Sequence, residues 1–249
     1  MSSGCKVRVL GALFLACALA GCPTRPRPAG VAAQPVAGPQ AIAPHVGRPY
    51  DIVAQQSLLT ILVYRGGTLS AAGHNHVIAS HALSGTIYLP ADILKASFEV
   101  RIPAAELTVD EPGLRAQENR ADFPPDVSDS ARDGTRRNML GQALLDAGEY
   151  PQLVLRAERL ESAPQAGPDG VLAHLQTQVR EQLRSISMPV HYERRAGELI
   201  VSGEGPLRQS DLGLTPFTAL MGALAVQDEM RVRFRIVARA ANTGAEPAH

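Results

Sequence analysis

The sequence of 249 residues has no tryptophan, and aromatic residues make up only 4% of the chain. Lysine plus arginine and aspartate plus glutamate number 24 each, so the formal net charge is zero. Nucleic acids are usually held by a positive field and by stacking platforms, and a chain of this composition offers neither. The composition therefore predicts no nucleic-acid partner.

Cysteine is confined to the N-terminus, at Cys5, Cys17 and Cys22. The body of the chain can therefore contain neither a disulfide framework nor a thiolate metal site. Enzyme motifs are also missing: there is no Gly-x-Ser-x-Gly, no phosphate-binding glycine loop and no His-Glu-x-x-His. The sequence favours a binding protein over an enzyme.

The first 22 residues are typical of a targeting segment. Lys6 and Arg8 precede an apolar run, Val9–Leu19, that is too short to span a bilayer. The four residues Leu-Ala-Gly-Cys that end at Cys22 resemble the lipobox of bacterial lipoprotein precursors. The resemblance implies a signal peptide over residues 1–21 and a membrane anchor through acylated Cys22. An ordinary secretory peptide is the alternative.

The residues after Cys22 predict a location and the domain boundaries. Pro23 stands where an Asp would suggest inner-membrane retention, so we expect an exported, periplasm-facing protein at the outer membrane rather than the inner one. Residues 22–48 form a Pro/Ala-rich tether with few large apolar side chains. The folded domain is expected over residues 49–240, and a disordered tail over residues 241–249.

Alternation of apolar and polar residues dominates the domain. It is clearest over Met230–Arg239, and it recurs over Phe98–Ile102 and Ile186–Tyr192. Such a period of two predicts strands with one face in a core. Pro189 cannot donate to a ladder, so we expect it at an edge or a bulge. Further strands are expected at Leu58–Tyr64, Val77–Ile78 with its flanks, Thr86–Leu89, Leu153–Leu160, Leu172–Val179 and Leu199–Gly203.

One stretch has helical spacing instead. Ser128, Asp129 and Ser130 offer an N-cap, Arg136–Ala147 repeats its apolar residues at helical intervals, and Gly148 is placed to end the helix. A shorter helix is expected at Leu114–Asn119. The pattern predicts an all-β fold with a helical insertion, an antiparallel β-barrel of about eight strands.

Several motifs then resemble the YceI-like family of lipocalin-like periplasmic proteins. A charged helix leads to Glu149-Tyr150-Pro151 and a strand, Ser210–Leu214 is similar to a "DFG"-like segment, and the chain closes on VRFRIVARA. The resemblance covers Asp51–Ala240. It implies an elongated barrel whose lumen holds an isoprenoid-type lipid. Asn138 stands near a position expected for His, which leaves the identity of the ligand open.

The predicted function is a membrane-tethered periplasmic protein that holds an isoprenoid-type or other long-chain amphiphile in its lumen. No firm cofactor is expected beyond this lipid ligand, and a homodimer is left open. Inward positions of the expected strands supply the ligand-binding candidates: Phe98, Val100, Ile102, Met188, Val190, Val232 and Phe234.

His74 and His76 are spaced so that both imidazoles share one face if the segment is a strand. They are candidate metal ligands, with His81 or a carboxylate completing the set. In the other interpretation, one histidine satisfies buried polar groups at the barrel mouth and the other is solvated. The pair supports an alternative function as a metal- or haem-linked redox accessory protein. A structural, stress-protective lipoprotein with a filled barrel is the third alternative.

Arg132, Arg136 and Arg137 form a basic group beside the expected helix. Arginine offers planar bidentate donors, so these residues are candidates for binding a phosphate or pyrophosphate headgroup. Solvated arginines on a helix surface are the alternative.

Overall fold

The computed structural model describes residues 45–164, 167 and 170–241. The predicted signal peptide, Cys22, most of the tether and residues 242–249 of the predicted tail lie outside this part of the chain. Within the described residues, no helix has the length and apolar character needed to cross a membrane. The first strand begins at Arg48 and the last ends at Ala240, close to the expected domain limits.

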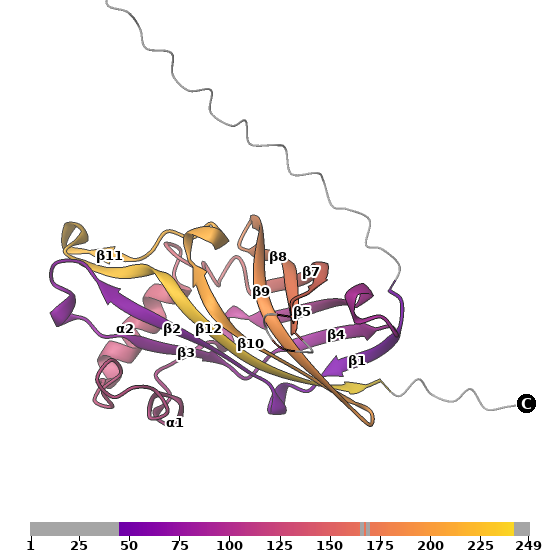
Figure 1. Cartoon of the computed structure of the whole chain (residues 1–249). Coiled ribbons are helices and arrows are strands. Elements are labelled where there is room, and N and C mark those ends of the chain that lie inside the picture. Colours follow the sequence, from indigo (N-terminus) through magenta and orange to yellow (C-terminus); the bar gives the residue numbers. More distant parts are fainter. Residues whose placement is uncertain (1–44, 165–166, 168–169, 242–249) are drawn as a thin grey trace, which may run out of the picture. The chain divides into compact units, whose positions relative to one another are not determined.

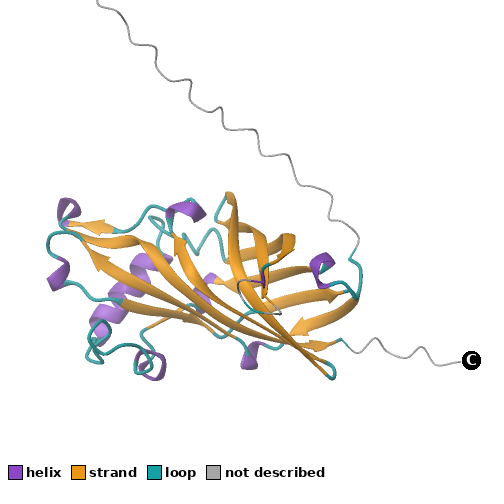
Figure 2. Ribbon diagram, in the orientation of Figure 1, coloured by secondary structure: helices purple, strands orange, loops and turns teal. Residues whose placement is uncertain are grey.

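Eight antiparallel strands close into a barrel (Figures 1 and 2), which confirms the predicted fold class. The barrel closes where Tyr50–Ile52 of the first strand pairs with Ala238–Ala240 of the last. Every neighbouring pair is hydrogen-bonded, so the closed part of the sheet has no free edge. In order around the barrel the strands are β1 (Arg48–Ile52), β4 (Ser84–Leu89), β5 (Ser97–Pro103), β7 (Gln152–Ser162), β8 (Gly170–Val179), β9 (Gln182–Arg195), β10 (Glu198–Arg208) and β12 (Leu224–Ala240).

The length of β12 lets the sheet branch. Its C-terminal end pairs with β1, while its remaining length pairs with β2 (Leu58–Gly66), which continues into β3 (His76–Ser80) and β6 (Thr108–Val109). The short strand β11 (Thr218–Ala219) pairs with the start of β12. Helix α2 (Asp129–Leu140) packs against β6. The branched end of the barrel is therefore walled partly by strands and partly by a helix (Figure 1).

The expected helix boundaries were partly wrong. The Ser128 Oγ accepts a hydrogen bond from the Ala131 N–H (3.3 Å), as the N-cap prediction requires. However, α2 ends at Leu140, because Gly141 takes an extended conformation, and turns replace the helix expected up to Ala147. The shorter helix α1 spans Pro112–Arg115 rather than Leu114–Asn119. Single 3₁₀ turns lie at Ala54–Gln56, Ser70–Ala72, Ile93–Lys95, Ala104–Glu106, Ser210–Leu212 and Leu220–Gly222.

Two irregular positions in the strand patterns have physical explanations. Pro189 lies opposite Leu172 in the β8–β9 ladder but beyond the β9–β10 ladder, which ends at His191, so it stands where one side of β9 is unpaired rather than on an edge strand. Val237, which interrupts the alternation of β12, is 1% exposed. The β1–β2 connection covers it from outside, and Ser57 exchanges hydrogen bonds with its backbone.

Candidate functional site

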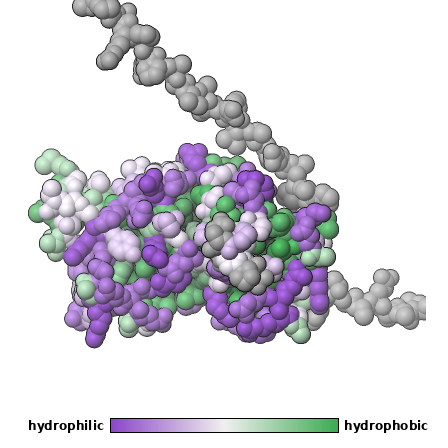
Figure 3. All heavy atoms as spheres, viewed as in Figure 1, coloured by the Kyte–Doolittle hydropathy of each residue, from purple (hydrophilic) through white to green (hydrophobic). Residues whose placement is uncertain are grey.

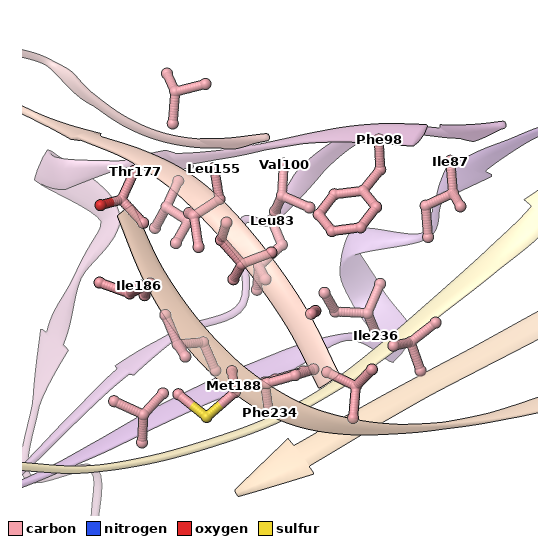
Figure 4. A pocket seen from close by; sticks show the side chains of 18 of the residues that line it. Leu83, Ile87, Phe98, Val100, Leu155, Thr177, Ile186, Met188, Phe234 and Ile236 are labelled. Atoms are coloured by element: carbon pink, nitrogen blue, oxygen red, sulfur yellow. The ribbon is translucent and has the colours of Figure 1, made fainter. Parts of the chain in front are cut away.

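The barrel interior contains two adjoining cavities. The first, here called the apolar cavity, has a volume of about 200 Å³. Its lining includes Thr177, Gln178 and Tyr192, but otherwise consists of aliphatic side chains and phenylalanines, and no charged residue of the described chain lines it. The Thr177 hydroxyl already donates to the Arg184 carbonyl (3.0 Å). The side chains converge from strands on all sides of the barrel (Figure 4). This cavity suits an unbranched or branched hydrocarbon chain.

All seven lumen candidates line the apolar cavity. They come from β5, β9 and β12, the three strands with the clearest alternation. The structure therefore places them where a ligand chain would lie, and the binding itself stays a prediction.

The second cavity, here called the mixed cavity, has a volume of about 340 Å³. It shares a wall with the apolar cavity, and the shared residues are Leu59, Ile61, Ile102, Leu153 and Leu212. Its polar lining residues gather at the branched end of the barrel: Tyr64, Arg65, His74, His76, Thr135, Asn138 and Gln209. Together the two cavities form an interior with an apolar end and a polar end, which is the pattern an amphiphile requires.

His76 is the best-positioned polar group of the mixed cavity. Its Nδ1 lies 2.7 Å from Asp110 Oδ2, and its Nε2 lies 3.1 Å from the Thr135 hydroxyl. The side chain is 12% exposed. Because β3 begins only at His76, His74 precedes the strand and is exposed. The two rings nevertheless lie 6.1 Å apart and both line the mixed cavity, as the expected shared face requires.

Asp110 holds His76 in place. Its carboxylate is fully buried and also accepts from the Val77 N–H (2.9 Å) and the Arg115 guanidinium (2.7 Å). Burial raises the pKa of Asp110, but the hydrogen bonds from His76 and Val77 and the charge of Arg115 outweigh burial and lower the pKa overall. The residue also has a φ of 52°, a left-handed conformation that is uncommon outside glycine.

Arg115 is held as firmly as its partner. It is 3% exposed, and it donates to the carbonyls of Asn75 (2.8 Å) and Pro124 (2.7 Å). Its guanidinium lies over the Phe123 ring at 5.6 Å. The Asp110–Arg115 pair is thus a buried, nearly neutral support behind His76.

Within the described residues, this geometry supplies no further metal ligand beside the two histidines. Both ring nitrogens of His76 have protein partners, and His81 bonds to Glu111 (3.1 Å) outside both cavity linings. Residues 45–164, 167 and 170–241 contain no group of three or more His, Cys, Asp or Glu side chains suited to a metal ion. The arrangement agrees with the other interpretation, in which one histidine satisfies a buried group and the other is solvated.

The three headgroup arginines do not line either cavity. Arg132 pairs with Asp129, Arg136 donates to the carbonyls of Ala105 (2.6 Å) and Leu107 (3.3 Å), and Arg137 is exposed. The opposite face of α2 lines the mixed cavity, through Ala131, Thr135, Asn138 and Met139. Helical periodicity separates the two faces.

A family model described as "YceI-like domain" matches residues 50–238. Among solved structures, Burkholderia cenocepacia BcnA is 15% identical, with a TM-score of 0.53 over 75% of this chain and 98% of that one. A polyisoprenoid binding domain from Saccharophagus degradans, implicated in plant cell wall breakdown, is 13% identical, with a TM-score of 0.51 over 77% and 98%. No curated protein matches by sequence.

Proposed function

Because the chain belongs to the YceI-like domain family, we propose that it is a lipid-binding protein that holds an isoprenoid-type chain in its barrel. It is a binding protein rather than an enzyme. The observation that carries the proposal is the apolar cavity, whose lining within residues 45–164, 167 and 170–241 carries no charge, and which continues into a cavity with a polar end. The named polyisoprenoid-binding relative of the same fold supports it.

The energetics favour long chains. Each methylene moved from water into the apolar cavity contributes about 0.8 kcal/mol, so affinity rises steeply with chain length. A preformed cavity also spares the cost of opening one. A short amphiphile would gain too little to compensate for its lost freedom.

The proposal includes tethering to the periplasmic face of a membrane through acylated Cys22. Twenty-five residues separate Cys22 from Arg48, which fully extended would reach about 85 Å. The 17-residue strand β12 spans about 55 Å. A tether of that length lets either end of the barrel reach the bilayer.

One end of the barrel is suited to contact the bilayer. Segments 66–73 and 212–226 contain no Asp, Glu, Lys or Arg, and the Leu69 N–H donates to the Ala223 carbonyl (2.8 Å) where they meet. We call these two segments the uncharged end. It presents Leu220 (66% exposed) and Met221 (107% exposed), and Figure 3 shows a pale to green projection there. Both segments also supply lining residues of the mixed cavity, so we infer that lipid enters here.

Native mass spectrometry of the full chain, purified gently from membranes, tests the function. A co-purifying long-chain adduct that organic extraction removes, and that the extracted protein takes up again, is the expected result. A protein that carries no adduct and takes up no long-chain amphiphile would overturn the proposal. Incorporation of radiolabelled palmitate, compared with a Cys22→Ala variant, tests the tether separately.

A further inference from the structure

The hydrogen-bond partners of His76 indicate which way each proton points when the ring is neutral. The ionised Asp110 accepts from Nδ1–H, so in the neutral ring Nε2 carries a lone pair and accepts. The Thr135 hydroxyl, 3.1 Å away, must then donate its proton to Nε2. Its oxygen keeps its own lone pairs, and both Thr135 and His76 line the mixed cavity. The chain Asp110–His76–Thr135 thus presents an acceptor to the ligand.

The charges around this acceptor do not suit an anion. Asp110 and Arg115 neutralise each other behind the cavity, at 2.7 Å. Arg65 is the one arginine or lysine among the described residues that line the mixed cavity, beside His74 and His76; it is exposed and donates to the Gly73 carbonyl (3.0 Å). A phosphate, with a charge of about −1.5 to −2, would lose its hydration there without a matching positive charge.

We propose that the Asp110–His76–Thr135 chain is a headgroup site that selects amphiphiles ending in an uncharged hydroxyl, such as a long-chain alcohol or a quinol, over the same chain ending in phosphate. The inference rests on the proposed lipid-binding function and adds the chemistry of the headgroup. The Thr135 Oγ accepts a hydrogen bond from the ligand hydroxyl, while the hydrocarbon chain of the ligand extends past the shared wall into the apolar cavity.

A matched ligand series tests the selection. Geranylgeraniol, its methyl ether and its phosphate carry the same chain, and their affinities for the extracted full chain follow from displacement of a fluorescent apolar probe. We expect the alcohol to bind about tenfold more tightly than the ether, which lacks the donor, because one hydrogen bond with a buried acceptor is at stake. The phosphate is expected to bind more weakly than the alcohol.

A pair of variants tests the residue. Thr135→Val keeps the shape of the side chain but removes the hydroxyl, so the alcohol should bind only as well as the ether, while the affinity for the ether stays unchanged. Thr86→Val makes the same change on β4, outside both cavity linings and outside the uncharged end, where the hydroxyl donates to Asp51 (2.8 Å), and should preserve the preference for the alcohol.

The outcomes separate this inference from the function beneath it. Equal binding of alcohol and ether, tighter binding of the phosphate, or a preference that survives Thr135→Val overturns the headgroup site and leaves lipid binding intact. Failure of all three ligands to displace the probe overturns the proposed function itself. Nitrogen-15 NMR of His76 gives a readout free of ligand: Nδ1 is expected to carry the proton, and a proton on Nε2 of the neutral ring overturns the proposal.

Discussion

At the scale of single residues, the polar end of the mixed cavity depends on the buried carboxylate of Asp110. Asp110 orients His76, accepts from the Val77 backbone, pairs with Arg115 and adopts a left-handed backbone conformation. Strain of that kind persists only where the surroundings determine it. The three interactions and the backbone conformation of Asp110 together make His76 a rigid rather than an adaptable group.

Substitution of Arg115 should lower the unfolding free energy of the protein. Arg115→Met leaves Asp110 buried without its cation, and the loss of one partner of a buried pair costs about 3–5 kcal/mol of unfolding free energy. Urea unfolding followed by circular dichroism measures it. Arg137→Met, at an exposed position of the same chain, serves as the control, and a shift within about 0.5 kcal/mol is expected there. Equal effects of the two substitutions would show that the pair contributes nothing.

Acid should act through Asp110. Its pKa in the folded protein lies below the ordinary value of 3.8, so its stabilising contribution is complete above that value and is lost as the pH falls from there through the folded pKa. The unfolding free energy of the natural protein should therefore fall more steeply below pH 3.8 than that of Asp110→Asn. Parallel pH curves for the two proteins would contradict the assignment.

At the scale of elements, the strands could be predicted from the sequence, but the course of the connections between them could not. Alternation in β5, β9 and β12 identified seven residues that do line the apolar cavity, because a period of two follows directly from strand geometry. Thr135 was within reach of the same logic, since it lies one helical turn before the buried Met139. Asp110 and Arg115 carry no such signal, because they lie in connections whose course depends on tertiary contacts.

The helix illustrates the limit. Leu144 stands at helical spacing from Leu140, yet it reaches the mixed cavity, like its neighbour Leu145, from turns beyond Gly141. Helical spacing of apolar residues indicates only that their side chains are buried, and side chains in a turn can be buried as well as those in a helix. Arg132, Arg136 and Arg137 lie outside both cavity linings. The sequence placed them near the helix, but it could not show which face of α2 meets the cavity.

A larger side chain inside the apolar cavity should prevent a ligand chain from occupying it. Ala173 on β8 is 1% exposed and lines this cavity, so Ala173→Phe projects a ring into the space proposed for the ligand chain. We expect retention of long-chain amphiphiles to fall at least tenfold in the displacement assay, with a loss of stability of about 1–3 kcal/mol or less. Ala196→Phe, in the exposed β9–β10 turn, adds the same ring elsewhere and should leave retention unchanged. Unaltered retention in Ala173→Phe would place the ligand outside the apolar cavity.

At the scale of the whole molecule, the distribution of charge has a direction. Acidic and basic residues number 24 each, yet none falls within segments 66–73 and 212–226. The sequence displays both gaps, but only the topology reveals that β2 and β12 bring them to the same end. That convergence could not be predicted from spacing, because more than 130 residues separate the two segments.

Lipid transfer should depend on the uncharged end. Leu220→Asp combined with Met221→Asp places two charges on its most exposed side chains, and charged groups are expelled from a bilayer surface region that apolar groups enter. We expect uptake of a fluorescent long-chain lipid from vesicles to slow at least several-fold, while affinity for ligand in detergent stays the same. Leu94→Asp, also on an exposed apolar side chain but outside these segments, is the matched control. Uptake at the natural rate in the double variant would rule out this entry route.

The strand that closes the barrel is also the one that the N-terminal residues lead into. β1 has only five residues, held by β4 on one side and by three residues of β12 on the other. Any mechanical tension on the chain before Arg48 therefore acts first on the Arg48–Leu89 pairing and next on Tyr50, opposite Ile87, whose side chain lines the apolar cavity. A pulling force would separate β1 from β4 and β12, next to the apolar cavity. Because β1 is the shortest strand of the closed barrel, it couples tension on the N-terminal residues to retention of the proposed ligand.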